Sequence, residues 1–415
     1  MIKIKPFRGV RYNQDKVDLS LVMAPPYDVI SPSEKQELLK RSEYNIVNLT
    51  LGTETPANNK RNNWYIKARS LFYEWLEKGI LIQDQKPCIY VLEEEFVLNN
   101  KKKKRKGFIF LVKIEDFNRG SVIPHEKTFD KPKEDRTNLL RVCKANFSSI
   151  FTLFSGNKTV CDILLNIHLY GLFVTKFNFL NIEHKLFKIE NVSIQNAIIN
   201  SLKTTQLFIA DGHHRYESAL AYFQERRNTN PHHTGEESYN YVMVYSSDIN
   251  DPALAILPTH RIIRKMSKTG IEDIEKKLSK YFTLVPVESK KEVLNNLNLS
   301  EIAVSIYKGT YILKRKKDVN WSRLIKDEKS KLDVIFLHDV IIEKILNINS
   351  EIDYFKDISY GLNEVRHNSQ SIVFFLPNPR ISDIKDIVIK GQRLPGKTTF
   401  FYPKLTTGVV INKLE

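Results

Sequence analysis

The chain has 415 residues, of which 42% are hydrophobic and 27% charged, a composition typical of folded, water-soluble proteins. No apolar run approaches the roughly 20 residues that a membrane-spanning helix needs, so no membrane partner is expected. The N-terminus lacks the apolar core of a signal peptide, and the three separated cysteines predict free thiols. Together these features predict a cytoplasmic protein.

The net charge of +16 has two interpretations. A strongly basic chain can bind nucleic acid or anionic substrates. The sequence is also rich in Lys, Asn and Ile, as proteins from AT-rich genomes tend to be, so part of the charge can be compositional. The charge leaves a nucleic-acid partner open, but we do not expect one on this ground alone.

Helices are clearly marked in the first part of the chain. Ser31-Pro32-Ser33-Glu34 is a capping box with proline at the first helical position, so a helix is expected to begin there. Apolar residues at helical spacing predict a second helix from Trp64 to Leu76, and Gly79 is expected to end it.

Two strands are predicted next, at 89–98 and 107–115. The connection between them contains a run of basic residues, 101–106. Such a run can clamp a nucleic acid, but no aromatic residue is interleaved for base stacking. We therefore predict a solvated hairpin tip.

The rest of the chain mixes helices and strands irregularly, which predicts a mixed α/β (α+β) fold rather than a regular barrel. The length allows two regions, 1–265 and 266–415, or one integrated domain. Further helices are predicted at 133–144, 271–282, 288–297, 333–346 and 382–390, further strands at 150–154, 207–210, 241–245 and 372–376, and a hairpin around Gly309.

The most informative motif is Asp211-Gly212-His213-His214-Arg215, between an apolar strand and an amphipathic helix. A glycine turn at a helix N-terminus is an anion site, because backbone N–H groups and the helix dipole point at the same spot. Arg215 adds a fork of donors for phosphate. His213 and His214 titrate near neutrality and can move protons or bind phosphate oxygens. Asp211 can cap the helix, hold a metal ion or act in catalysis.

A plain N-cap with surface histidines is the alternative interpretation of this motif. That interpretation would explain a single such residue. Five of them together, one aspartate, one glycine, two histidines and one arginine, in one strand-to-helix turn favour a functional site. A zinc site through the two histidines is not expected, because residues adjacent in sequence rarely bind one ion together.

Two loops nearer the N-terminus carry further candidates. His125-Glu126-Lys127 follows a strand, and it offers Glu126 as a general base and Lys127 as a phosphate ligand. An exposed loop with ion pairs is the alternative. Two prolines hold Tyr27 and Asp28 in a rigid turn, which suits a structural turn and a binding loop equally.

Two later motifs repeat the pattern of basic side chains after a strand. His260-Arg261 follows the dipeptide Leu257-Pro258. The tail at 394–405 carries Lys397 and Lys404 in an extended frame. Gly396-Lys397-Thr398 is not a P-loop, because the earlier glycine and the following helix are missing.

These motifs, in this order, resemble those of the bacterial and archaeal domain-of-unknown-function family numbered ten-fifteen. The resemblance spans essentially the whole chain. It is carried by Pro6-Phe7-Arg8, Ala24 to Val29, His125 to Thr128, Glu134-Asp135-Arg136, Ile209 to Arg215, Leu257-Pro258, His260-Arg261, Leu332-Asp333-Val334, Pro395, Lys397 to Phe400, Pro403-Lys404-Leu405 and Gly408.

The Asp-Gly-His-His-Arg element also resembles that of the ParB/sulfiredoxin-like superfamily, in which it binds nucleotide phosphates at a helix N-terminus. The resemblance thus implies a ParB/sulfiredoxin-like core in region 1–265, with the tail of region 266–415 adding a loop to the site. The related enzymes are free-serine kinases, which use ATP or ADP with magnesium. By this resemblance Asp211 takes the role of the catalytic aspartate and is the candidate Mg²⁺ ligand. Glu126 is our candidate for the separate catalytic glutamate.

Two classes of function follow from the residues and the resemblance. The first is an enzyme that transfers a phosphoryl group between a nucleotide and a small metabolite such as serine, or a phosphatase acting on phosphoserine. The second is a nucleotide-dependent, DNA-associating protein of the ParB kind. For the enzyme, the predicted catalytic residues are Asp211, Glu126 and His213, and the predicted substrate or phosphate ligands are Gly212, His214, Arg215, His125, Lys127, Tyr27, Asp28, His260, Arg261, Lys397 and Lys404.

Overall fold

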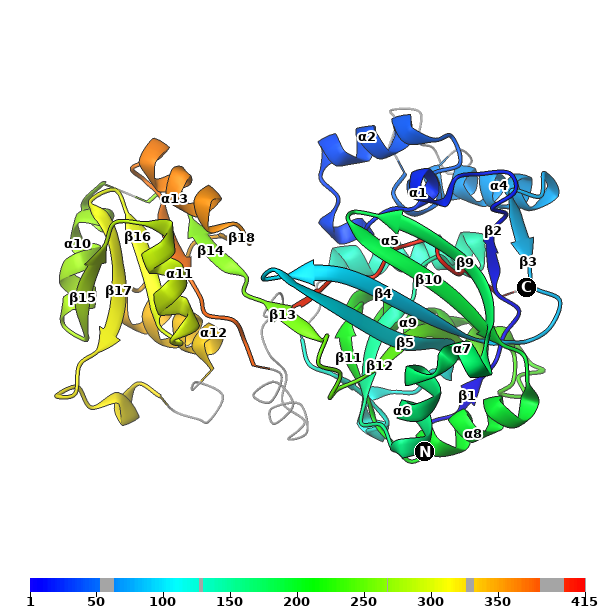
Figure 1. Ribbon diagram of the computed structural model, residues 1–415. Coiled ribbons are helices and arrows are strands. Elements are labelled where there is room, and N and C mark those ends of the chain that lie inside the picture. The colour runs from blue at the N-terminus through cyan, green and yellow to red at the C-terminus, as the bar shows by residue number, and fades with distance from the viewer. Residues whose placement is uncertain (53–62, 127–129, 267, 326–331, 381–398, 415) are drawn as a thin grey trace. The chain divides into compact units, whose positions relative to one another are not determined.

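The computed structural model describes residues 1–52, 63–126, 130–266, 268–325, 332–380 and 399–414 (Figure 1). They form two compact units. Unit 1 consists of residues 1–124, 128–255 and 403–415, and unit 2 consists of residues 125–127 and 256–402. The last stretch of the chain therefore returns to unit 1.

Unit 1 is built on a nine-stranded mixed sheet in the order β6-β11-β8-β12-β5-β4-β10-β9, with β1 paired to β5. The pairs β6–β11 and β8–β12 are parallel, and the other pairs are antiparallel. The strands are β1 (Ile4–Lys5), β4 (Ile89–Leu98), β5 (Lys101–Lys113), β6 (Val122–Pro124), β8 (Ile150–Phe154), β9 (Leu172–Phe179), β10 (Ile182–Ile189), β11 (Leu207–Asp211) and β12 (Tyr241–Asp248).

Two short antiparallel pairs complete the strands of unit 1. One joins β2 (Val10–Tyr12) to β3 (Leu81–Gln83), and the other joins β7 (Ala145–Asn146) to β21 (Asn412–Lys413). The second pair fastens the end of the chain to the segment before β8.

The helices of unit 1 share its core with the large sheet. Tyr216 and Ala219 of α9 lie in the same apolar cluster as Ile150 of β8 and Ile209 of β11. This packing fixes the start of α9 beside the end of β11. The helices are α1 (Leu19–Val22), α2 (Pro32–Arg41), α3 (Val47–Thr50), α4 (Trp64–Glu77), α5 (Asp130–Cys143), α6 (Lys158–Leu165), α7 (Ile167–Tyr170), α8 (Val192–Leu202) and α9 (His213–Thr229).

The predicted connection at 99–106 is wrong, because only Asn99 and Asn100 turn the chain between β4 and β5. Both have positive φ angles, 51° and 59°, as a tight two-residue hairpin turn requires. The basic run 101–106 is the first half of β5. Its residues 104–106 pair with the acidic stretch Glu93 to Glu95 of β4, and residues 101–103 pair with Phe96 to Leu98. Charge complementarity between 104–106 and 93–95 stabilises strand pairing inside the predicted connection.

Unit 2 is built on a six-stranded antiparallel sheet in the order β15-β17-β16-β19-β14-β18. Its strands are β14 (His260–Ile263), β15 (Phe282–Val287), β16 (Ile302–Ile306), β17 (Gly309–Arg315), β18 (Ile352–Phe355) and β19 (Ile372–Phe375), with β13 (Ala255–Leu257) and β20 (Phe400–Tyr402) outside this sheet. The helices are α10 (Lys268–Ser279), α11 (Lys290–Asn298), α12 (Asp333–Ile335) and α13 (Ile358–His367).

The mixed α/β fold predicted from the sequence is confirmed. The capping box at Ser31 is present with both of its reciprocal hydrogen bonds. The helix predicted at 333–346 begins as α12 and continues as a π-helical stretch, Phe336–Ile345. The helix predicted at 382–390 lies outside the described residues. Among the helices that the structure describes, none is long and apolar enough to cross a membrane.

Candidate functional site

The predicted strand–turn–helix is present, and its turn requires glycine. Strand β11 ends at Asp211, and α9 begins at His213. Between them Gly212 adopts the left-handed conformation, with φ 94° and ψ 29°. A Cβ atom at this position would also lie 2.9 Å from the Arg215 guanidinium. Glycine is therefore needed for two reasons: it adopts the left-handed turn, and it leaves room for the Arg215 side chain.

The Asp211 carboxylate lies between two cations. Arg215 donates from Nη2 to Oδ2 at 2.7 Å, and the Nζ of Lys404 contacts Oδ1. The three side chains are only 11–14% exposed. Burial by itself raises the pKa of Asp211, but Lys404 and Arg215 outweigh it and hold the pKa below its ordinary value. The carboxylate is therefore ionised at neutral pH.

The Arg215 side chain is also held from its other edge. Its Nη1 donates to the hydroxyl of Ser148 at 3.1 Å and to the carbonyl oxygen of Ser149. Both serines immediately precede β8, the strand paired with β11. The guanidinium is thus fixed in orientation, as recognition of a planar or tetrahedral anion requires.

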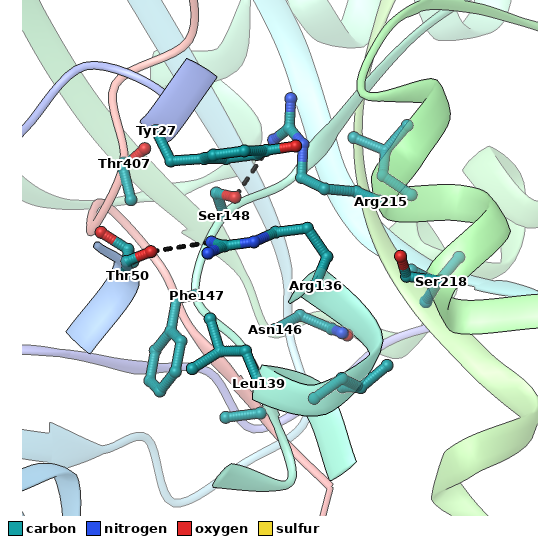
Figure 2. A pocket seen from close by; sticks show the side chains of 14 residues that line it. Tyr27, Thr50, Arg136, Leu139, Asn146, Phe147, Ser148, Arg215, Ser218 and Thr407 are labelled. Carbon is teal, nitrogen blue, oxygen red and sulfur yellow. Dashed lines mark hydrogen bonds between the residues drawn. The ribbon is translucent and has the colours of Figure 1, made fainter. Parts of the chain in front are cut away.

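A pocket lies beside Arg215 (Figure 2). Its free volume is about 60 Å³. This is space for roughly four water molecules, or for a group of phosphate size. Residues of its wall include Tyr27, Thr50, Arg136, Asn146, Phe147, Ser148, Arg215 and Thr407.

Tyr27 and Arg136 form one wall of this pocket. The Arg136 guanidinium carbon lies 4.1 Å from the centre of the Tyr27 ring, and Nη1 donates to the Thr50 carbonyl at 2.8 Å. Asp135 accepts from the same guanidinium, so its charge is largely balanced. Burial, and then Asp28, raise the pKa of Tyr27 to about 12. Its hydroxyl is therefore protonated at neutral pH and can donate a hydrogen bond.

The two histidines of the motif occupy the first turn of α9. His213 is buried, and its positive charge would add to the lowering of the Asp211 pKa. His214 is half-buried. Their positions suit hydrogen bonding to an anion at this helix end, and that role stays a prediction.

Four further predicted residues that the structure describes lie in unit 2. The first two, His125 and Glu126, form a compact hydrogen-bonded group with Thr399. The backbone N–H and hydroxyl of Thr399 both donate to Oε1 of Glu126 at 2.9 Å. The same hydroxyl lies 2.8 Å from Nε2 of His125. This threonine was not among the predicted site residues, although it stands in one of the motifs quoted for the family resemblance.

His260 and Arg261 are buried in β14. The Nδ1 atom of His260 accepts from the backbone N–H of Leu376 at 3.1 Å, and burial, followed by Arg261, lowers its pKa to about 3. Arg261 donates to the Thr259 carbonyl and to Nε2 of His338, and burial lowers its pKa to about 10. Their role as phosphate ligands stays a prediction.

Asp211, Gly212, Arg215 and Lys404 thus come together in unit 1, and Tyr27 lines the adjoining pocket. Lys127 and Lys397 lie outside the described residues. Prediction from sequence did not include Arg136 or Ser148 in the site. Arg136 stands in the quoted motif Glu134-Asp135-Arg136, whereas nothing in the sequence around Ser148 indicates its contact with Arg215.

The described surroundings of Asp211 do not form a metal site by themselves. Both carboxylate oxygens are engaged by cations. Among the residues that the structure describes, no group of three or more His, Cys, Asp or Glu could hold a metal ion. The Mg²⁺ predicted at Asp211 stays a prediction.

The sequence matches a known protein family. The family described as "Protein of unknown function (DUF1015)" matches residues 4–335. The chain belongs to this family. In this DUF1015 protein Asp211 to Arg215 fall inside the matched range, whereas Lys404 lies beyond it. A comparison with curated proteins found no match.

Several solved structures resemble the DUF1015 protein at low sequence identity. SbnI with a C-terminal truncation, from Staphylococcus aureus, is 9% identical, with a TM-score of 0.39, over 73% of this chain and 87% of its own. A conserved hypothetical protein from Pyrococcus furiosus is 11% identical, with a TM-score of 0.35, over 71% and 92%. A free serine kinase in complex with AMP is 12% identical, with a TM-score of 0.34, over 68% and 84%. A likeness of this size assigns no function by itself.

Proposed function

We propose that the protein binds the phosphate groups of ATP or ADP at the Asp211–Arg215 turn and transfers a phosphoryl group to a small hydroxylated metabolite, with serine as the candidate. One observation carries the proposal. Two cations from distant parts of the chain, Arg215 and Lys404, converge on Asp211 where α9 begins.

Phosphate is the anion that this arrangement suits best. The N-terminus of α9 offers backbone N–H groups and the positive end of the helix dipole. Arg215 presents a fixed fork of donors, and Lys404 adds a compact positive charge. The Asp211 carboxylate bridges the two cations in the free protein, so an incoming phosphate would share or replace it as their counter-ion.

Phosphoryl transfer needs positioning and charge stabilisation more than covalent help. The hydroxyl oxygen of the metabolite would form a bond to the terminal phosphorus, and the bond from that phosphorus to the bridging oxygen of the nucleotide would break. The hydroxyl proton would pass to a carboxylate, Asp211 or Glu126. Arg215, Lys404, His213 and His214 would neutralise the phosphate oxygens.

The remaining predicted residues are proposed as secondary ligands. Tyr27, with its protonated hydroxyl, belongs to the pocket beside Arg215. Asp28, His125, Lys127, His260, Arg261 and Lys397 are proposed ligands of the substrate or its phosphate. The ParB/sulfiredoxin-like ancestry of the core is part of the same proposal.

The alternative of a DNA-associating protein draws little support from the basic run in β5. Lys104 and Lys106 form ion pairs with Glu93 at 3.3 Å, and Lys102 lies 3.9 Å from Glu95. Arg105 is buried. A run that is paired and partly buried offers a weak surface for nucleic-acid phosphates.

The proposal is tested by ³¹P NMR of the purified protein in three mixtures: ATP or ADP with magnesium and L-serine, phosphoserine with nucleotide, and phosphoserine alone. Transfer to or from serine that is lost in Asp211→Asn is the expected result. Phosphate release from phosphoserine without nucleotide would favour a phosphatase. No turnover in any mixture, with duplex DNA bound in a steeply salt-dependent manner, would favour the DNA-associating alternative.

A further inference from the structure

The segment Pro403–Thr407, here called the tail segment, places Lys404 against Asp211. It belongs to unit 1 and is attached to that unit at several points on either side of the lysine. These attachments involve side chains that take no part in the proposed chemistry. Together these attachments determine the position of Lys404.

The first attachment comes from a buried ion pair. Arg105 of β5 and Glu94 of β4 are both fully buried, and Arg105 donates to Oε2 of Glu94 from Nη2 at 2.6 Å and from Nε at 2.9 Å. The same Nη2 donates to the carbonyl oxygen of Pro403 at 2.8 Å. The residue bonded to Arg105 is therefore the direct neighbour of Lys404.

The stability of the fold alone does not explain this ion pair. Burying two charges is costly, and apolar residues of similar size commonly serve as well. Here Oε1 of Glu94 and Nη1 of Arg105 are buried without a hydrogen-bond partner. An apolar pair could not donate a hydrogen bond to a backbone carbonyl oxygen, whereas a guanidinium can do so in a fixed orientation.

The second attachment lies on the other side of the lysine. The hydroxyl of Thr406 is 2.9 Å from Nε2 of His184, a fully buried side chain of β10. The His184 ring is stacked on Phe177 with a centroid distance of 4.7 Å, and its Nδ1 lies 3.1 Å from the carbonyl oxygen of Ile182. The ring has little freedom, so it is a rigid anchor for Thr406.

The third attachment joins the tail segment to the turn that carries Tyr27. The backbone N–H of Thr407 donates to the carbonyl oxygen of Ala24 at 2.8 Å, and its hydroxyl donates to the carbonyl oxygen of Pro25 at 3.2 Å. Thr407 also lines the pocket (Figure 2). One segment thus supports Lys404 and the Tyr27 turn together.

We infer that Arg105, Glu94 and His184 are positioning residues, which hold the tail segment so that Lys404 is fixed on Asp211. The inference deepens the proposed function, because that function gives Lys404 its task at the phosphate. The placement itself is a property of the free protein. It can be measured without nucleotide, so its failure and the failure of the proposed function are distinguishable.

The test is amine labelling of the intact protein without nucleotide, followed residue by residue by mass spectrometry. Lys413, further along the same tail, is the internal reference. In Arg105→Lys, which keeps the charge but loses the fork, Lys404 should be labelled roughly two- to tenfold faster than in the wild type, as loss of a hydrogen bond of this kind predicts. Labelling of Lys413 should not change.

Thr406→Val removes only the hydroxyl that is hydrogen-bonded to His184. If Arg105→Lys does not fold, the labelling rate of Lys404 in Thr406→Val tests the inference. This substitution should also speed the labelling of Lys404. Thr205→Val is the matched control, since Thr205 donates to the Leu202 carbonyl at 2.9 Å, away from the tail segment. Unchanged labelling of Lys404 in every variant that folds, or an equal rise at Lys413, would overturn the inference.

Discussion

Lys404 meets the carboxylate of Asp211 from a position 193 residues further along the chain. The aspartate ends β11 in the large sheet of unit 1, whereas the lysine belongs to the last stretch of the chain, which returns to that unit. Lys404 is thus a second cation, beside Arg215, at the N-terminus of α9. The candidate site of unit 1 is therefore complete only when the tail is in place.

Arg215→Lys should weaken nucleotide binding. A lysine keeps the charge, but it cannot hold the Asp211 carboxylate, Ser148 and a phosphate with one planar fork. We expect the Kd for ADP, measured by isothermal titration calorimetry, to rise about tenfold or more, the usual effect of losing a charge-assisted hydrogen bond. Arg141→Lys is the control, because Arg141 also grips a carboxylate, that of Glu225, but on an exposed face. An equal effect of both substitutions would contradict the assignment.

Gly212→Ala should destabilise unit 1 more than Gly120→Ala does. Both glycines have positive φ, 94° and 74°, so alanine costs backbone strain of about 1 kcal/mol at either position. Only at Gly212 would the new Cβ also meet the Arg215 guanidinium, since nothing lies within 4 Å of a Cβ at Gly120. Urea unfolding should show the larger loss at Gly212, about 2 kcal/mol or more. Equal losses in the free energy of unfolding for the two variants would contradict the close packing of Arg215 against Gly212.

Acid should destabilise the protein through His184. Burial lowers the pKa of His184 to about 4, whereas an unfolded histidine titrates near 6.5. The unfolded state thus binds the proton first, so stability is lost as the pH falls from about 6.5 toward 4, by on the order of 3 kcal/mol for this side chain. His184→Gln should flatten that part of the stability profile, whereas His232→Gln, at an exposed position, should not. A profile unchanged by His184→Gln would contradict the neutral, buried histidine.

Removing magnesium should affect nucleotide binding only modestly. The proposed phosphate ligands are fixed cations and backbone N–H groups, and both oxygens of Asp211 are already engaged. ADP titrations with magnesium and with EDTA should therefore give Kd values that agree within about tenfold, or roughly 1.4 kcal/mol. A loss of binding in EDTA would show that a metal ion is part of the binding site.

The local part of the site could be predicted from sequence. A strand that ends in Asp211-Gly212, followed by an amphipathic helix, has few other interpretations, because backbone geometry at such a turn is set by neighbouring residues. The capping box at Ser31 was predictable for the same reason. In each case the interacting groups lie within a few positions of one another.

The contacts across long sequence distances could not be derived in this way. Family resemblance included Lys404 among the site residues, but no spacing rule links it to Asp211. The prediction of a loop for the basic run is wrong because a charge pattern does not show which strand lies opposite. Here Glu93 to Glu95 of β4 lie opposite residues 104–106. Arg105 illustrates the point best, since within a run of lysines it is the buried residue that grips Pro403.

The central claim is that Lys404 and Arg215 form a phosphate site around Asp211, and its most direct test is calorimetric titration of ADP into Lys404→Met. The wild type should bind, Lys413→Met should bind equally well, and Lys404→Met should bind at least about tenfold more weakly. Equal Kd values for Lys404→Met and the wild type would show that the lysine is only a structural partner of Asp211 and would contradict the account.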